Sequence, residues 1–380
     1  MGSNGRRLPG GVSTTNGAGR ARIAMACGGS AGHVFPACAV ADAQPEGVEA
    51  VFLGGVRGLE MRILRARGHR LLTTPAAPLA LTGMRGKIVG VGSTAAGALA
   101  ARRILRHEGV RLVVGFGGYA CAPAVLAAWS LRIPIVLLEG NAVAGTGNRS
   151  LAPFATLALL AEPSASAAFR CPTRITGVPV RADILAVQAA APHGSLHVLV
   201  CGGSLGSAFL DEHVPSMLAR VAARGQRVMV RHIGDPERAT EAYARANIPA
   251  TVLPFADDMA AEYARANVAI MSAGATTLAE LAAVGLPAAL VSLASVAHDH
   301  QTANARAFSA ATGAVWCREA NWDEESVAAH IAALAAQPAV WAEAAAGMRR
   351  KARAEATAAV VQACLELLDR RADADVVSRR

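Results

Sequence analysis

The chain has 380 residues, of which 53% are hydrophobic and 17% charged, so it can bury one large core or two ordinary ones. Two domains of common size are the better expectation. Seven scattered cysteines form no CxxC pair and no metal-ligand spacing, which favours reduced thiols in a cytosol over a disulfide framework. The net charge of +9 is almost all arginine and is not interleaved with aromatic residues. This pattern argues against a nucleic-acid partner and leaves anionic lipid or phosphorylated substrates as candidates.

Residues 1–21 are rich in glycine, serine and arginine and lack the apolar run of a signal peptide, so we expect a disordered extension. The longest uncharged stretch, Leu112 to Leu131, is long enough to span a bilayer. Three glycines and a proline divide it, and they favour a buried strand, a tight turn and the start of a helix.

An internal repeat is the most informative feature of the sequence. Arg22–Ala26 runs into CysGlyGlySerAlaGly (27–32), and His197–Val200 runs into CysGlyGlySerLeuGly (201–206). Further apolar strands, each followed by a helix-forming segment, are expected at Ala50–Leu53, Leu112–Val114, Ile135–Leu138, Arg227–His232, Thr251–Leu253, Val268–Met271 and Ala288–Val291. Such alternation predicts an α/β protein with two doubly wound, Rossmann-like domains that face a cleft.

The expected join between the domains lies near Gly177–Ala182, where GlyValProValArg interrupts the alternation. We therefore expect an N-terminal domain at 22–179, a C-terminal domain at 180–345, and a C-terminal helix and tail at 346–380. The alanine-rich segment from Val340 to Leu368 is expected to be helical.

Each glycine turn suits phosphate binding, because it leaves backbone N–H groups unpaired at a helix N-terminus. A tight turn without a ligand explains one copy equally well, but two copies in register favour binding. Neither copy is a GxGxxG fingerprint or a Walker A loop. His33 follows the first turn and is either a general base or a histidine that caps the helix.

The second half contains SerAlaGlyAlaThrThrLeuAlaGlu at 272–280. Thr276 and Thr277 can offer hydroxyl and N–H groups to a diphosphate, and Glu280 can accept both hydroxyls of a ribose. The alternative is a helix start with a favourable acid in its first turns. His298 and His300 lack a third metal ligand, so a polar loop is favoured there; nearby Gln301 and Asn304 suit hydrogen bonds to sugar hydroxyls.

Nine motifs in order resemble the MurG family, from about residue 22 to about residue 368. They are GlyGlySerAlaGlyHisValPhePro (28–36), PheLeuGlyGlyValArgGlyLeuGlu (52–60), ValValGlyPheGlyGlyTyr (113–119), GluGlyAsnAlaValAlaGly (139–145), GlyValProValArg (177–181), GlyGlySerLeuGly (202–206), ProPheAlaAspAspMet (254–259), the 272–280 motif and HisAspHisGlnThrAlaAsnAla (298–305). The resemblance implies a GT-B fold, with the acceptor in the N-terminal half and the nucleotide sugar in the C-terminal half.

The implied reaction is inverting transfer of N-acetylglucosamine from UDP-N-acetylglucosamine to the 4-hydroxyl of lipid I, which gives lipid II and UDP in peptidoglycan synthesis. The implied location is the cytoplasmic face of the bacterial cell membrane, as a peripheral protein. Its implied partners are anionic phospholipid and other cell-wall synthesis proteins. The resemblance implies no cofactor and no required metal ion.

The resemblance also assigns site residues. His33 is the first candidate for the catalytic base and Glu139 the second. The implied donor-binding residues are Ser30, Ala31, Gly32, Asn141, Arg181, Ser204, Ala256, Ala275, Thr276, Thr277, Leu278, Ala279, Glu280 and Gln301. Ser30, Ala31 and Gly32 would also frame the acceptor diphosphate. The implied acceptor-binding residues are Gly28, Gly29, Tyr119 and Asn148.

The chain departs from the family pattern at two acceptor-side places, at Ala279, where some members have serine, and at 71–88. The family's membrane-docking segment includes aromatic side chains, whereas 71–88 has leucines and basic residues but no aromatic side chain. Serine and alanine stand at 30 and 31, where the family has threonine and glycine, and LeuGluGlyAsn (138–141) replaces HisGluGlnAsn. Three alternatives remain open: a related GT-B enzyme that glycosylates diacylglycerol, a nicotinamide-dependent oxidoreductase, and a catalytically degenerate scaffold. The oxidoreductase predicts an acid that closes the second strand, whereas Leu53 is followed by two glycines.

Overall fold

The computed structural model describes residues 20–55, 59–74, 83–118, 121–204, 206–293 and 299–377. The first sheet forms the N-terminal lobe and has seven parallel strands in the order β3-β2-β1-β4-β5-β6-β7. These strands are β1 (Ala21–Ala26), β2 (Val48–Gly54), β3 (Leu71–Thr73), β4 (Val110–Gly115), β5 (Ile135–Glu139), β6 (Leu157–Leu160) and β7 (Thr173–Ile175). The order reverses beside β1, which places the switch point of this sheet at the first glycine turn.

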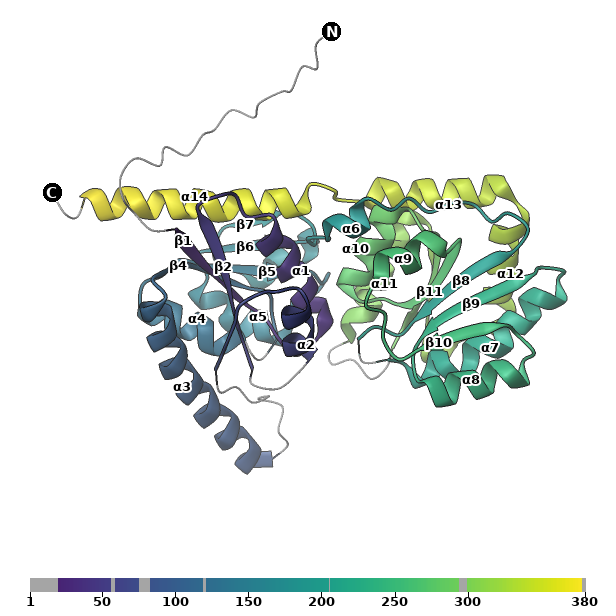
Figure 1. The fold of residues 1–380 in the computed structure, drawn as a ribbon, viewed down its shortest axis with the longest axis horizontal. Helices are drawn as coiled ribbons and strands as arrows, with labels where there is room; N and C mark the ends of the chain where they lie inside the picture. The colour runs from purple at the N-terminus through teal and green to yellow at the C-terminus, as the bar shows by residue number, and fades with distance from the viewer. Residues whose placement is uncertain are drawn as a thin grey trace, which may run out of the picture.

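The second sheet forms the C-terminal lobe and has six parallel strands in the order β10-β9-β8-β11-β12-β13. They are β8 (Leu196–Cys201), β9 (Val228–Ile233), β10 (Ala250–Leu253), β11 (Val268–Ser272), β12 (Ala288–Ser292) and β13 (Val315–Arg318). Its switch point lies beside β8, at the second glycine turn. The two lobes lie side by side in Figure 1.

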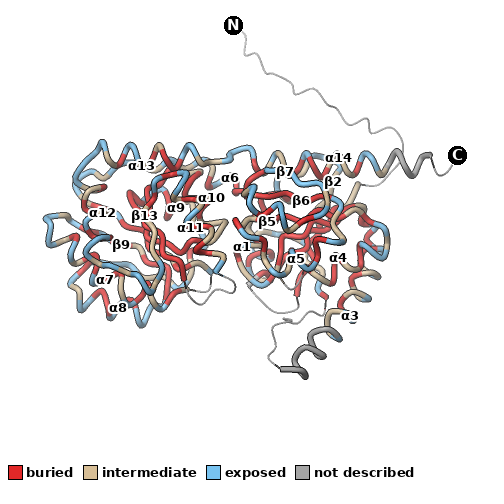
Figure 2. Tube along the Cα trace, turned by 180° about the vertical axis from the view of Figure 1, so that it is seen from behind, coloured by how far each residue is buried: buried red, intermediate tan, exposed pale blue. Residues whose placement is uncertain are grey.

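Helices cover both faces of each sheet, and the strands between them are the most deeply buried segments in Figure 2. The N-terminal lobe contains α1 (Ala31–Asp42), α2 (Leu59–Ala66), α3 (Gly83–His107), α4 (Cys121–Ser130) and α5 (Thr146–Leu151). The C-terminal part contains α6 (Ala182–Leu185), α7 (Ala208–Ala223), α8 (Pro236–Arg245), α9 (Met259–Arg265), α10 (Ala275–Val284), α11 (His300–Thr312), α12 (Glu324–Ala336), α13 (Pro338–Lys351) and α14 (Ala356–Val377). Each sheet thus has apolar contacts on both sides, as a parallel sheet requires.

The chain crosses between the lobes twice. The first crossing, at 176–182, carries the chain into the C-terminal lobe, and the second, at 352–355, carries it back. The segment expected to be helical at 340–368 is therefore two helices with a break between them. Helix α13 packs on the C-terminal lobe through Trp341 and Met348, whereas α14 buries Val360 and Cys364 in the core of the N-terminal lobe (Figure 1).

All nine strands expected from the sequence are present, with ends within about two residues. Sequence reasoning missed four strands: β3, β6, β7 and β13. Three of them, β3, β7 and β13, lie at sheet edges and have three or four residues each, so their apolar patterns are short. The uncharged stretch at 112–131 forms β4, a turn and α4, as expected. Among the described residues, no helix is both long and apolar enough to cross a membrane.

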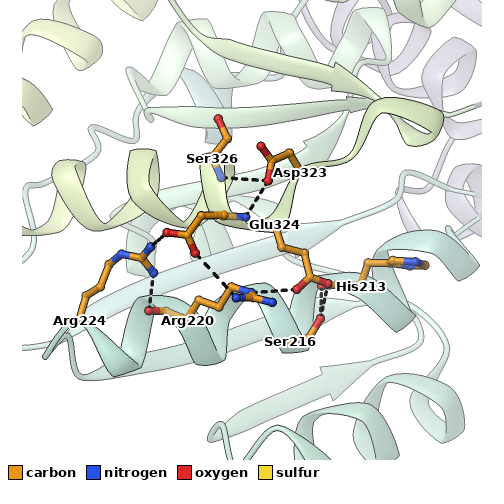
Figure 3. A network of polar contacts seen from close by, with 8 residues as sticks. His213, Ser216, Arg220, Arg224, Asp323, Glu324 and Ser326 are labelled. Carbon is orange, nitrogen blue, oxygen red and sulfur yellow. Dashed lines mark hydrogen bonds and ion pairs between the residues drawn. The ribbon is translucent and has the colours of Figure 1, made fainter.

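A polar network holds α7, the helix after the second glycine turn, against α12 (Figure 3). Arg220 and Ser216 of α7 bond to the Glu324 carboxylate at 3.0 and 2.7 Å. Arg224 pairs with Glu325, and Asp323 caps α12 by accepting from the N–H groups of its first turn. These contacts are at the surface, so each contributes at most about 1 kcal/mol. They fix the direction of α7 behind the cleft.

The packing of α13 depends on Gly347. A Cβ there would collide with the carbonyl oxygen of Thr312 at the end of α11. We expect Gly347→Ala to lower the free energy of unfolding by about 1–3 kcal/mol, because backbone must move to accept the methyl group. The control is Gly92→Ala in α3, where no heavy atom lies within 4 Å. This helical substitution should stabilise by up to about 1 kcal/mol. Urea titration followed by circular dichroism compares the two, and an unchanged Gly347→Ala protein would contradict the packing argument.

Candidate active site

A cleft of about 2050 Å³ lies between the lobes, at the carboxyl ends of both sheets. Its walls include the residues after β1, β4 and β5 in one lobe, and those after β8, β9, β10 and β11 in the other. Ligands of doubly wound sheets bind at this edge. The cleft is therefore the candidate site, and both glycine turns border it.

The first turn aims His33 into the cleft. Gly29 has a φ of +87°, which reverses the chain after β1 so that α1 begins at Ala31. The Nδ1 atom of His33 lies 3.3 Å from the carbonyl oxygen of Gly28 and 3.1 Å from Oγ of Ser30. Because a carbonyl oxygen only accepts, Nδ1 carries the proton in the neutral ring and Nε2 is left as a base. Burial lowers the pKa of His33 below the ordinary 6.5, although the Gly28 contact and Glu139 oppose this shift. The neutral, basic form therefore prevails at neutral pH.

The turn after β4 supports the other side of the same imidazole. Gly117 and Gly118 have φ values of +93° and +78°. A Cβ on Gly117 would lie 3.2 Å from Nε2 of His33, and a Cβ on Gly118 would collide with the carbonyl oxygen of Gly28. Both positions favour glycine because of their positive φ. Each also lacks room for a side chain, Gly117 because of His33 and Gly118 because of Gly28.

The loop after β5 is organised by Glu139, the second candidate base. One carboxylate oxygen accepts from the backbone N–H of Asn141 at 2.9 Å and from its side chain at 2.8 Å. The other accepts from the N–H of Gly145 at 2.8 Å and from Nδ2 of Asn148 at 3.0 Å. With four donors around it, this buried carboxylate holds the loop in place. By contrast, Nε2 of His33 has no hydrogen-bond partner among the described residues, which is the arrangement that a base requires.

Helix α10 points its N-terminus into the cleft from the C-terminal lobe. Gly274 precedes its first residue, and Ala275, Thr276 and Thr277 border the cleft. The free N–H groups of a ten-residue helix carry partial positive charge that favours an anion. The hydroxyl of Thr276 donates to the carbonyl oxygen of Gly32 at 2.9 Å, so this helix start touches the first glycine turn.

Glu280 lies one turn further along α10 and is buried. Its carboxylate accepts from the hydroxyl of Tyr263 at 3.0 Å and pairs with Arg181 at 3.4 Å. Burial raises the pKa of Glu280, while Arg181 and Tyr263 act to lower it. The Arg181 guanidinium also stacks on the ring of Phe35 in α1, 4.2 Å from its centre. Its Nε atom is buried and has no hydrogen-bond partner among the described residues.

The second glycine turn is longer than the first. Gly203 has a φ of +85°, but α7 begins only at Ala208, where the Ser207 hydroxyl caps it. Ser204 is exposed on the cleft wall. Behind the turn, buried Asp211 lies 3.0 Å from Nε2 of His232. The two turns are thus alike in the positive φ of the second glycine of each GlyGly pair and different in where their helices start.

Most residues expected at the site meet in the cleft. Those that border it are Ser30, Ala31, Gly32, His33, Glu139, Asn141, Asn148, Arg181, Ser204, Ala256, Ala275, Thr276, Thr277, Glu280 and Gln301. Gly28 and Gly29 do not line the cleft; Gly28 is buried and Gly29 is exposed. Leu278 and Ala279 face the core of the C-terminal lobe and a second cavity of about 60 Å³. Tyr119 and His298 lie outside the described residues.

Sequence reasoning did not find two contributors: Tyr263, which donates to the Glu280 carboxylate, and Phe35, whose ring lies against the Arg181 guanidinium. Asn304, which the sequence suggested for sugar hydroxyls, instead bonds to Ala142 and Asn141 of the other lobe. Phe35 lies within the motif at 28–36 and Asn304 within the motif at 298–305, so membership of a motif was the available sequence evidence for a role of these side chains. For Tyr263 the sequence offered only its place in the first turns of a helix after ProPheAlaAspAspMet.

Two facing parallel α/β lobes, with helix N-termini on both sides of one cleft, are the architecture of the GT-B class. Comparisons with known proteins agree. The chain matches the glycosyltransferase family 28 N-terminal domain over residues 23–160 and the glycosyltransferase family 28 C-terminal domain over residues 197–361.

Curated relatives named UDP-N-acetylglucosamine--N-acetylmuramyl-(pentapeptide) pyrophosphoryl-undecaprenol N-acetylglucosamine transferase are closely similar. The protein of Sorangium cellulosum is 38% identical over 91% of this chain and 88% of its own length. That of Acidithiobacillus ferrooxidans is 39% identical over 90% and 97%. The crystal structure of Acinetobacter baumannii MurG superposes with a TM-score of 0.71 at 30% identity, covering 91% of this chain and 99% of that one. The chain belongs to the MurG family of glycosyltransferase family 28.

The contact between Gly117 and His33 gives a test of the site geometry. Gly117→Ala should displace the imidazole and lower kcat about tenfold or more, because small misplacements of a catalytic group are costly. Binding of UDP should be unchanged. Gly109→Ala is the control, since Gly109 also has positive φ (+63°) but no heavy atom near its Cβ position. Steady-state kinetics and calorimetry separate the effects, and equal losses of kcat in both variants would contradict the contact.

Proposed function

We propose that this chain transfers N-acetylglucosamine from UDP-N-acetylglucosamine to the 4-hydroxyl of lipid I and so forms lipid II and UDP. The names of the curated relatives support this reaction. One observation carries the proposal: two kinds of group face each other across the cleft. One is the His33 imidazole, whose Nε2 has no partner among the described residues, and the other is the start of α10 beside the buried Arg181–Glu280 pair. The first suits a hydroxyl nucleophile, and the second suits a nucleoside diphosphate.

The division of labour follows the lobes. The N-terminal domain, 22–179, takes the acceptor, whose diphosphate lies at the first glycine turn. The C-terminal domain, 180–345, takes the nucleotide sugar. The start of α10 and Ser204 hold the donor diphosphate, Glu280 accepts the ribose hydroxyls, and the backbone of Ala256 contacts uracil. Gln301 uses its Oε1 to accept from the N–H of Leu293 at 2.9 Å, which leaves its amide nitrogen for the donor.

The reaction is a single in-line displacement. The acceptor hydroxyl oxygen attacks the anomeric carbon while Nε2 of His33 removes its proton. The bond between the anomeric carbon and the diphosphate oxygen breaks, its electron pair leaves with UDP, and the anomeric configuration inverts. The start of α10 and the Arg181 guanidinium stabilise the negative charge that develops on the leaving diphosphate.

We place the protein on the cytoplasmic face of the cell membrane, in contact with anionic phospholipid. Two large apolar side chains of the N-terminal lobe support this placement: Leu99 in α3 is 62% exposed and Trp129 in α4 is 58% exposed. Arg102 and Arg103 follow on α3, and such a mixture suits an anionic interface. The apolar and basic segment at 71–88, which also fits this role, lies mostly outside the residues whose side chains are described. Contacts with other cell-wall synthesis proteins belong to the same proposal.

The direct test supplies the purified chain with UDP-N-acetylglucosamine and either a short-chain lipid I analogue or diacylglycerol. We expect a product that contains N-acetylglucosamine only from the lipid I analogue. Transfer only to diacylglycerol would reassign the acceptor, and no transfer to either lipid would favour a degenerate scaffold.

His33→Ala should lower kcat by about a hundredfold or more, because it removes the base. In the parent, the active form is the neutral imidazole, so activity falls as pH drops through the pKa of His33. Since that pKa is lowered, the acid limb of kcat/KM should lie below pH 6.5 and vanish in the variant. His330→Ala is the control, since burial also lowers the pKa of His330, which does not border the cleft. Parental turnover in His33→Ala would refute the assignment.

Glu280→Ala should weaken UDP binding by about 1–3 kcal/mol if two ribose contacts are lost. Glu262→Ala is the matched control: this buried carboxylate of α9 pairs with Arg231 and Arg265 but does not border the cleft. It should lower stability without changing UDP affinity. Calorimetric titration measures both variants, and parental UDP affinity in Glu280→Ala would remove the ribose role.

A further inference from the structure

Asn304 connects the two lobes through a buried side chain that the reaction above does not use. It lies on α11 of the C-terminal lobe and is 4% exposed. Its Oδ1 accepts from the backbone N–H of Ala142 at 2.8 Å. Its Nδ2 donates to Oδ1 of Asn141 at 3.0 Å and to the carbonyl oxygen of Ala273 at 3.2 Å. Two of its three bonds therefore reach the loop after β5 in the other lobe.

The orientation of this carboxamide is fixed by its backbone partners. The Ala142 N–H can only donate and the Ala273 carbonyl can only accept, so Oδ1 and Nδ2 of Asn304 cannot exchange places. Nδ2 then requires an acceptor on Asn141, which is its Oδ1. The Nδ2 of Asn141 faces the opposite way, toward Glu139, at 2.8 Å. One chain of bonds thus sets both asparagines.

Asn304 has little capacity left for a sugar. Both of its N–H donors are used within the protein, and only one lone pair of Oδ1 remains. Both asparagines border the cleft, but Asn141 is only half-buried and keeps one N–H and one lone pair. Asn141 is accordingly the residue able to contact the donor sugar, and Asn304 sets the direction in which it does so.

The loop and the C-terminal lobe are close enough for this arrangement because residue 140 is glycine. A Cβ at Gly140 would lie 3.2 Å from the Cβ of Ala275 and 3.2 Å from a methyl carbon of Val178. At the edge of the cleft, the hydrogen bond from the Thr276 hydroxyl to the carbonyl oxygen of Gly32 also joins the two lobes. The Asn304 bonds to Ala142 and Ala273 are buried and its bond to Asn141 is partly buried, so water competes with them less than with the exposed Thr276 bond.

We infer that Asn304 is a positioning residue that orients Asn141 toward the sugar of the donor and does so only when the lobes are closed. The inference rests on the proposed function for the identity of that sugar. It predicts a specific signature: loss of Asn304 weakens recognition of the sugar part of the donor and leaves recognition of UDP intact.

The test compares Asn304→Asp with the parent by calorimetric titration of UDP and of UDP-N-acetylglucosamine. The substitution keeps the acceptor for Ala142 and removes both donors, so Asn141 loses its partner. We expect about a tenfold loss of affinity for UDP-N-acetylglucosamine and no change for UDP, as befits the loss of buried hydrogen bonds. Equal losses for both ligands would show a merely structural role, and unchanged affinities would remove the role altogether. Either result overturns the inference.

Asn267→Asp is the matched control. Asn267 is also buried, and its carboxamide bonds the backbone of Ala190 and His197 within the C-terminal lobe. The same chemical change there should lower the thermal midpoint of unfolding. It should not change the ratio of the affinities for UDP and UDP-N-acetylglucosamine. If Asn267→Asp weakened binding of UDP-N-acetylglucosamine relative to UDP as much as Asn304→Asp does, the inference would be overturned.

A double-mutant cycle with Asn141→Ala and Asn304→Ala keeps the inference testable if Asn304→Asp does not fold. In the Asn141→Ala background, Asn304→Ala should cost little further sugar affinity, because its effect passes through Asn141. Additive losses would contradict it. Failure of the proposed function is distinguishable, because it appears as no transfer by the parent, whereas these titrations measure binding alone.

Discussion

The buried positive charge of Arg181 is the constraint on which the cleft depends. A guanidinium out of water must be compensated, and here the Glu280 carboxylate lies at 3.4 Å while the guanidinium lies over the ring of Phe35. Phe35 belongs to one lobe and Glu280 to the other, so the compensation is complete only when the lobes meet. The buried Nε of Arg181 has no partner among the described residues, and in the proposed complex the donor diphosphate supplies one.

The two candidate bases differ in how their polar atoms are used. Glu139 accepts four hydrogen bonds and fixes the loop that carries Asn141 and Asn148. Among the described residues, His33 makes hydrogen bonds only through Nδ1, and it is confined by Gly117, so Nε2 is positioned without a partner from this part of the chain. A group that organises a loop and a group that exchanges a proton need opposite arrangements. These two arrangements belong to different residues: Glu139 ends β5, and His33 follows β1, which β4 separates from β5 in the sheet.

The sequence was sufficient for the parallel sheets, the two glycine turns and most of the cleft wall, because these depend on local patterns. The sequence was insufficient where the direction of a side chain depends on three-dimensional geometry. Successive residues of a helix are rotated by about 100°, so the residues of one continuous motif cannot all point into the cleft. Leu278 and Ala279 therefore face the core, although Thr277 and Glu280 border the cleft. The Asn304–Asn141 pair joins residues far apart in sequence, and no local pattern reports such a contact. The break between α13 and α14 has the same origin, because the helices pack on different lobes.

The contacts between the lobes fall into two groups with different consequences. At the chain crossings, Lys351 pairs with Glu162 at 2.5 Å and the Thr357 hydroxyl donates to the carbonyl oxygen of Val180 at 3.1 Å. Across the cleft, the main bonds are those of Thr276 and Asn304. A rotation about the crossings would break the second group and preserve the first, at a cost of a few hydrogen bonds of about 1 kcal/mol each. That cost is small beside the binding energy of a nucleotide sugar, so a donor that favours the aligned Asn141 also favours the closed arrangement of the lobes.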